Sequence, residues 1–127
     1  DVTFTVEGEE CSAAISAPRL KEVILNLAEN GLKYNRPGGR LTVTVTPGTN
    51  QVTLQVADTG LGIPAEDQAR VFERFYRVDK GRCRKDGGTG LGLAIVKHIV
   101  ALYHGSIELK SQLDVGSTFS ITLPKAV

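Results

Sequence analysis

The alternation of apolar and polar residues predicts where this chain forms strands and helices. Apolar and polar residues alternate in a strand that is buried on one face, and five segments with this pattern are predicted as strands. They are residues 2–6, 41–46, 52–56, 106–110 and 117–123. Apolar residues recur every three or four positions over residues 18–34 and 91–102, which predicts two long amphipathic helices. A third, short helix is expected around residues 68–75.

These segments define the expected fold class. Residues 41–57 are predicted to form a β-hairpin around the turn at residues 47–50. With the strands in one layer and the helices in the other, we expect an α/β (α+β) two-layer sandwich. Its sheet would be mixed and would pack on about three helices. The chain has 127 residues, 41% of them apolar, which predicts one domain over residues 1–127.

Composition and charge narrow the classes of function. The 15 basic and 14 acidic residues give a net charge of +1, so no global field would attract nucleic acid or an anionic membrane. Cys11 and Cys83 lie far apart and lack a metal-binding spacing, which favours reduced thiols in the cytoplasm. The sequence contains neither a signal peptide nor an apolar run of membrane length.

The first long helix carries a polar stripe beside its apolar face. Asn26, Asn30 and Lys33 fall within about 60° of one another on a helical wheel. An amide oxygen can ligate Mg²⁺ without adding negative charge, and a lysine can contact a phosphate. Tyr34 lies at the border of the stripe, where its ring could stack on a base. The alternative is a solvated face on which Glu29 and Lys33 form an ordinary pair.

A glycine-rich turn follows the third predicted strand. In Asp58-Thr59-Gly60-Leu61-Gly62, the carboxylate could accept a hydrogen bond from an exocyclic amine, and the glycines let backbone approach a flat ligand. Pro64 and Ala65 do not fit a dinucleotide-binding loop. The alternative is a turn without a ligand.

Residues 76–90 form a basic, glycine-containing segment before the second long helix. Its five positive charges come from Arg77, Lys80, Arg82, Arg84 and Lys85. The helix opens with Gly88-Thr89-Gly90-Leu91-Gly92-Leu93, and the N–H groups of a helix N-terminus suit a polyphosphate. The sequence contains no Walker P-loop motif. The alternative is a mobile surface loop before a glycine-relaxed helix start.

In combination, these segments resemble the GHKL ATPase superfamily in its histidine-kinase form. Residues 25–34 are similar to its N box, residues 58–64 to its G1 box, residues 71–77 to its F box and residues 88–97 to its G2 box. The resemblance covers the chain in the right order. It implies the GHKL ATPase fold, with a mainly antiparallel sheet, and the ATP-binding catalytic domain of a bacterial two-component sensor histidine kinase.

The resemblance implies a role for each motif residue. Asn30 would ligate Mg²⁺, and Asn26 would assist at the nucleotide. Asn30, Lys33 and Arg77 would form the catalytic set at the phosphates. Asp58 would read the adenine amino group. The other nucleotide contacts would come from Tyr34, Gly60, Gly62, Ile63, Tyr76, Lys80, Gly88, Thr89, Gly90, Leu91, Gly92, Leu93 and, near the aspartate, Thr118.

The resemblance also implies the partners. The chain would bind ATP or ADP and donate the γ-phosphate to a histidine on the dimerisation domain of the same protein, which serves a response regulator. We expect a monomeric cytoplasmic fragment of a homodimeric, membrane-anchored kinase, and no nucleic-acid partner. Neither His98 nor His104 is predicted to accept phosphate.

Two other activities of the superfamily are alternatives. Its ATP-hydrolysing members carry a glutamate one turn before the metal asparagine, where this chain has Asn26, so we expect ATP to be held without hydrolysis. A non-transferring ATP-binding or anti-sigma-type serine kinase module shares the four boxes. Two residues depart from the family: Gly31 replaces a usual alanine, which should destabilise the helix by roughly 1 kcal/mol, and Asn35 replaces threonine or serine.

Overall fold

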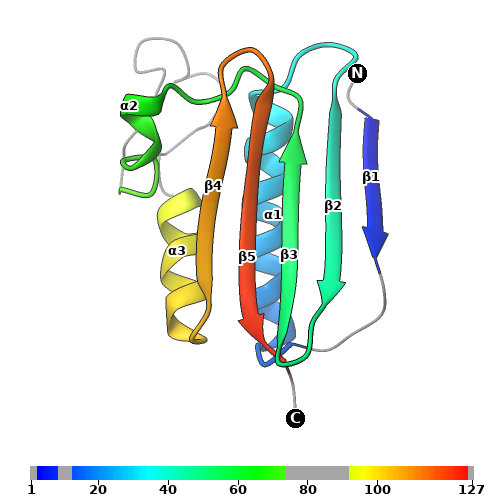
Figure 1. Cartoon of the computed structure of the whole chain (residues 1–127), viewed down its shortest axis with the longest axis vertical. Coiled ribbons are helices and arrows are strands. Elements are labelled where there is room, and N and C mark those ends of the chain that lie inside the picture. Colours follow the sequence, from blue (N-terminus) through cyan, green and yellow to red (C-terminus); the bar gives the residue numbers. More distant parts are fainter. Residues whose placement is uncertain (1–2, 9–12, 74–91, 126–127) are drawn as a thin grey trace.

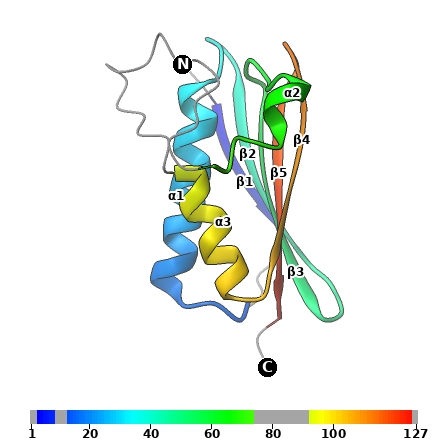
Figure 2. The same ribbon diagram turned by 90° about the vertical axis from the view of Figure 1, so that its left-hand side faces the viewer.

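The protein is a five-stranded sheet with two long helices on one face (Figures 1 and 2). The computed structural model describes residues 3–8, 13–73 and 92–125, and of residues 3–8 only the strand itself. The strands are β1 (Thr3–Gly8), β2 (Arg40–Pro47), β3 (Gln51–Asp58), β4 (Ser106–Gln112) and β5 (Gly116–Pro124). The helices are α1 (Ala17–Lys33), α2 (Ala65–Gln68) and α3 (Gly92–Leu102).

The sheet is mixed and mainly antiparallel, as predicted. Its strand order is β1-β2-β3-β5-β4. Only the β1–β2 pair is parallel, and the other three pairs are antiparallel. The predicted hairpin is confirmed as β2 and β3, which pair from Leu41 opposite Asp58 to Pro47 opposite Val52.

One core lies between the sheet and the two long helices. Because side chains alternate along a strand, every second residue of β3 and β5 faces the helices. Val56 is paired with Phe119 and Leu54 with Ile121, and all four are buried. The most fully buried side chains are Val23, Leu27, Leu41, Val56, Val96, Val100, Phe119 and Ile121.

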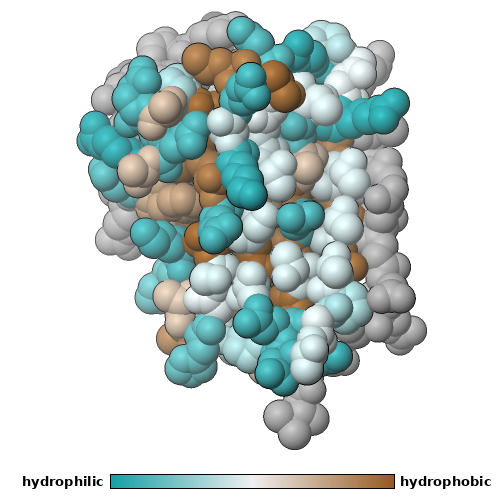
Figure 3. Space-filling view, in the orientation of Figure 1, coloured by the Kyte–Doolittle hydropathy of each residue, from teal (hydrophilic) through white to brown (hydrophobic). Residues whose placement is uncertain are grey.

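The opposite face of the sheet is open to solvent and polar. Figure 3 shows this face, on which pale and teal side chains predominate over the middle of the sheet. Its residues include Thr44 of β2, Gln55 of β3 and Ser120 of β5, and Gln55 Nε2 donates a hydrogen bond to Ser120 Oγ at 3.2 Å. An antiparallel sheet with one buried and one solvated face accounts for the strict alternation in the sequence.

Helix α1 matches the prediction to within one residue at each end. Ser16 is its N-cap in an extended conformation, and a proline occupies its first turn, where the missing N–H has no helical partner to lose. Ser16 Oγ makes no capping hydrogen bond and instead lies 3.2 Å from Tyr103 Oη. Tyr34 is the C-cap. No helix in the described part of the chain has both the length and the apolarity needed to cross a membrane.

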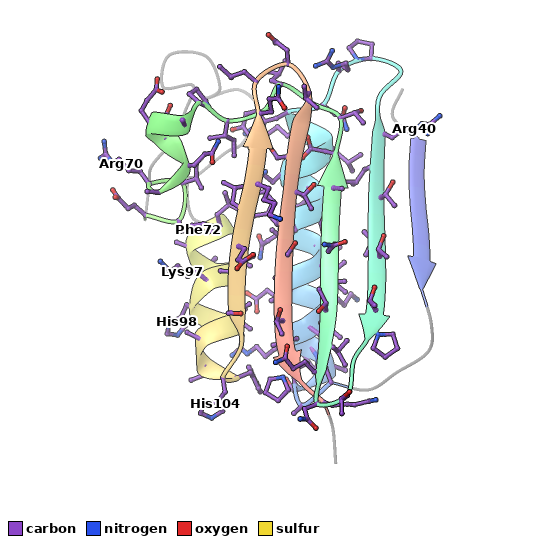
Figure 4. All side chains as sticks on the ribbon, in the orientation of Figure 1. Arg40, Arg70, Phe72, Lys97, His98 and His104 are labelled. Atoms are coloured by element: carbon purple, nitrogen blue, oxygen red, sulfur yellow. The ribbon has the colours of Figure 1, made fainter. Side chains whose placement is uncertain are left out.

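The short helix expected around residues 68–75 was wrongly placed over residues 68–73, and the last two residues of that range lie outside the described part of the chain. Helix α2 spans Ala65–Gln68, with Glu66 and Asp67 in its first turn, where carboxylates favour a helix start. The chain then turns and seats Phe72 against the core. The Phe72 ring meets the Phe119 ring edge-on at 6.0 Å, and Lys97 Nζ of α3 lies 5.6 Å from the Phe72 centroid (Figure 4).

Candidate functional site

The polar flank of α1 faces the first described residue of α3. Figure 2 shows the two helices side by side on the sheet, with α3 beginning about halfway along α1. A Cβ atom placed on Gly92 would lie 3.3 Å from Asn26 Oδ1. The predicted neighbours, the amide-bearing helix and the glycine-led helix start, are therefore adjacent in space.

The side chain of Asn26 is oriented by its own helix. Asn26 Nδ2 donates a hydrogen bond to the carbonyl oxygen of Glu22 at 2.9 Å. This leaves Oδ1, the acceptor end of the amide, turned toward Gly92. Asn30 and Lys33 are half-buried on the same flank, and Lys33 Nζ lies 5.4 Å from the ring centroid of Tyr34.

A row of polar residues ends the apolar surface that the sheet presents to the helices. The register aligns Asp58 of β3 with Ser117 of β5, and Ser117 with Ser111 of β4. The preceding row on this face consists of Val56, Phe119 and a leucine of β4. The change from apolar to polar residues in one cross-strand row provides a place for a ligand with polar edges.

Asp58 is half-buried and held by two backbone amides. Asp58 Oδ1 accepts a hydrogen bond from Gly60 N at 2.9 Å, and the carboxylate also accepts one from Ser117 N. Burial raises the pKa of Asp58 above its ordinary value of 3.8, and the two hydrogen bonds oppose this rise in part. The carboxylate is thus positioned as an acceptor in a partly desolvated site.

The structure places Ser117, and not Thr118, beside Asp58. Thr118 pairs with Ala57 and points to the open face of the sheet, so its expected place near the aspartate is wrong. Ser117 is 6% exposed and shares the helix-facing side with Asp58. The sequence contained the signal, because Ser117 is in phase with the buried residues Phe119 and Ile121.

Ser111 joins the polar row to the segment that follows Gly62. Its Oγ accepts a hydrogen bond from Ile63 N at 2.7 Å, lies 2.7 Å from Ser117 Oγ and donates to Gly116 O at 3.0 Å. Gln68 Nε2 adds links to Ile63 O at 2.9 Å and to Ser111 O at 3.1 Å. We had not predicted either serine as part of the site.

Gly60 and Gly62 allow the turn after β3 to pack against backbone on both sides. A Cβ on Gly60 would collide with the carbonyl oxygen of Tyr34, which also accepts a hydrogen bond from Leu61 N at 3.1 Å. Gly62 has a φ of 74°, and a Cβ there would collide with the carbonyl oxygen of Gln112. The two glycines therefore seat the turn between the end of α1 and the β4–β5 hairpin.

Part of the predicted site lies outside the described residues. These positions are Tyr76, Arg77, Lys80, Gly88, Thr89, Gly90 and Leu91. Leu93 and Ile63 are described, and both pack against the core as partly buried residues. In the described ranges, no three His, Cys, Asp or Glu side chains are grouped so that they could hold a metal.

A shallow hollow of about 300 Å³ at the β2–β3 hairpin is not a candidate for this site. Its lining runs from Thr46 to Thr53 and contains no charged side chain. It lies at the start of β3, whereas Asp58 ends that strand, seven residues or about 23 Å further on.

Comparisons with known proteins place these features in a family. Residues 15–127 match the family described as histidine kinase-, DNA gyrase B-, and HSP90-like ATPase. The chain is 47% identical over 106 residues to the sensor-like histidine kinase SenX3 of Mycolicibacterium smegmatis. This match covers 84% of the chain but only 28% of SenX3, so the chain spans little more than a quarter of that relative.

Solved structures show the same fold. The mycobacterial sensor histidine kinase MprB superposes with a TM-score of 0.87 at 31% identity, covering 98% of this chain and 84% of that one. Full-length ShkA in complex with AMPPNP superposes with a TM-score of 0.83 at 30% identity, covering 99% of this chain and 26% of that one.

Proposed function

The chain belongs to the histidine kinase-, DNA gyrase B- and HSP90-like ATPase family, and from this premise we propose that it binds Mg-ATP and donates the γ-phosphate to a histidine. The acceptor would lie on the dimerisation domain of a longer sensor kinase, in which residues 1–127 form the ATP-binding domain. That kinase would be a homodimer whose catalytic domain faces the cytoplasm, and its phosphohistidine would serve a response regulator.

One arrangement carries the proposal. Asn26 Oδ1 of α1 faces Gly92 at the start of α3, and Asp58 ends strand β3. The phosphates would lie between the polar flank of α1 and the N-terminus of α3, where helix N–H groups favour anions. The base would lie at the polar row of Asp58 and Ser117. The ShkA complex with AMPPNP supports a nucleotide as the ligand.

The residues at this position fit a magnesium ion bound together with the nucleotide. Asn26 already directs an uncharged oxygen toward Gly92, and Asn30 lies one turn further along the same flank. Such oxygens ligate Mg²⁺ without repelling phosphates. When bound, Mg²⁺ would neutralise charge on the phosphates. Lys33, on the same flank, would contact them directly, and Arg77 would join these residues in the catalytic set.

The residues of α1 favour transfer over hydrolysis, because the side chain that faces Gly92 is an amide and not a carboxylate. Glu22 is paired with Arg19 through a 2.9 Å contact, and Glu29 is exposed. On the described part of α1, the side chain beside Gly92 is therefore an amide, which cannot act as a general base toward water. What the site offers is positioning and charge stabilisation, which are the main requirements of phosphoryl transfer.

Titration with ATP tests the proposal. The wild-type chain should bind ATP saturably and more tightly with Mg²⁺ than without it, as measured by calorimetry. Asp58→Ala should weaken ATP binding at least about tenfold, because the acceptor for the base amine is lost. Glu108→Ala, which removes an exposed carboxylate from β4, is the control and should bind within about twofold of wild type. The absence of saturable ATP binding by the wild type would refute the proposal.

A further inference from the structure

Arg36 lies just after α1 and joins three parts of the chain. Its Nη2 atom donates hydrogen bonds to the carbonyl oxygen of Gly60 at 3.0 Å and to that of Asp114 at 2.7 Å. Gly60 belongs to the turn after β3, and Asp114 to the turn between β4 and β5. One guanidinium group therefore ties the end of α1 to both turns. The sequence motifs gave no indication of this residue.

The peptide units on either side of Gly60 are held from two directions. Arg36 binds the carbonyl oxygen of Gly60, while the amide of the same residue donates to Asp58 Oδ1 at 2.9 Å. A displacement of Gly60 would therefore move the hydrogen bond that orients the Asp58 carboxylate. The contact from Arg36 carries a charged donor, and such hydrogen bonds are stronger than neutral ones.

Neighbouring backbone hydrogen bonds keep the turns together without Arg36. Leu61 N donates to Tyr34 O at 3.1 Å, and Asp114 N donates to Leu61 O at 2.9 Å. Because the Leu61 bond also holds the peptide unit of the Gly60 carbonyl, the loss of Arg36 should loosen Gly60 in part while leaving the turns attached. Arg36 is exposed to solvent, so its replacement opens no cavity in the core.

We infer that Arg36 is a positioning residue of the base site, which fixes the Asp58 carboxylate through Gly60 and so contributes to selection of adenine. The inference rests on the proposed function, because it takes Asp58 as the residue that reads the base. A site built around a hydrogen bond discriminates strongly against a ligand that lacks the matching group. That discrimination requires the acceptor to be held in place before the ligand binds.

Inosine triphosphate separates positioning from general damage. It carries the same ribose and triphosphate as ATP, but an oxygen replaces the exocyclic amine, so it lacks the amine hydrogen that Asp58 is proposed to accept. A variant with a generally weakened site should lose affinity for both nucleotides. A variant with a misplaced Asp58 should lose affinity for ATP alone.

The test compares the dissociation constants of Mg-ATP and Mg-ITP for wild type, Arg36→Met and Arg19→Met. Arg19 supplies a matched loss of charge at the other end of α1, where it pairs with Glu22 on the surface. In Arg36→Met, we expect ATP affinity to fall about tenfold and ITP affinity to stay within about twofold. The ATP preference of Arg19→Met should equal that of wild type.

Arg36→Lys keeps the charge and provides a second measurement if Arg36→Met does not fold. Because its ammonium is shorter in reach and lacks the planar fork, we expect a smaller fall in ATP preference, about threefold. An unchanged preference in the folded Arg36 variants, or an equal fall in Arg19→Met, would overturn the inference. A wild-type chain that does not prefer ATP to ITP would instead refute the reading of the base by Asp58.

Discussion

Asp58 shows how a single residue can be held in a partly desolvated position at the expense of the fold. The carboxylate is half-buried, and burial raises its pKa above 3.8. In a folded protein, a raised carboxyl pKa means that the neutral acid is favoured over the charged form relative to the unfolded chain. In the ligand-free protein, the charge that would accept the base amine is therefore kept at a cost to the stability of the fold.

This linkage predicts a pH dependence with a definite sign. The contribution of Asp58 to stability is fully present below pH 3.8 and is lost as pH rises through the higher folded pKa. The unfolding free energy of wild type minus that of Asp58→Asn should therefore decrease between pH 3.5 and pH 7. Urea unfolding of both proteins at several pH values measures this difference. A difference that stays constant or increases over that range would contradict the prediction.

At the scale of residues, the sequence predicted chemistry better than contacts. The expected closeness of Asn26 to the start of α3 is confirmed, while the role of Asp58 in reading a base stays a prediction. Gly31 was interpreted only as a destabilising departure from alanine. The structure shows that a Cβ there would lie 2.6 Å from Leu41 Cδ1, so the glycine makes room for a buried side chain of β2. Such a contact depends on packing between distant segments and cannot be read from local pattern.

At the scale of elements, the polar network around Ser111 connects the β4–β5 hairpin to the turn that leads into α2. Its hydroxyl is the partner of Ile63 N at 2.7 Å and of Ser117 Oγ at 2.7 Å. Removal of the hydroxyl would leave a backbone N–H and a buried hydroxyl without their partner. Each such group costs about 1–3 kcal/mol when it is left unsatisfied.

We therefore expect Ser111→Ala to lower the unfolding free energy by about 2 kcal/mol, as measured by urea denaturation. Ser106→Ala is the matched control on the same strand, because Ser106 is exposed, and it should change stability by less than about 0.5 kcal/mol. Equal effects of the two substitutions would show that the Ser111 hydroxyl does not support the turn.

Long elements were predictable from the sequence because their periodicity extends over many residues. Helix α1 and the β2–β3 hairpin were located to within a residue or two. The four-residue α2 was misplaced, because a helix of one turn has no periodicity, and its start depends on Pro64 and the two carboxylates after it. The chain that follows α2 is held by the packing of Phe72 on Phe119, which lies 47 positions further along the chain.

At the scale of the whole molecule, the layers could be predicted, but the order of the strands could not. Strand β5 lies between β3 and β4. Alternation shows which face of a strand is buried and does not identify its neighbour. That order places Asp58 and Ser117 side by side and forms the polar row. The place proposed for the base is therefore a property of the topology, while the place proposed for the phosphates follows from two helices whose motifs the sequence displays.

The positions of the two histidines lead to the final prediction, which concerns where the phosphate goes. His104 follows the end of α3 with a φ of 63°, and His98 is exposed on that helix (Figure 4). At 1.5 Å per residue along the helix axis, His98 lies about 9 Å and His104 about 18 Å from Gly92, away from the site proposed for the phosphates. With ³²P-labelled Mg-ATP, the chain alone should not acquire an acid-labile, base-stable label. A separately prepared histidine-bearing dimerisation domain should acquire it when the chain is added. Label on the chain itself that is lost in His98→Gln or His104→Gln would show that the acceptor lies within these 127 residues.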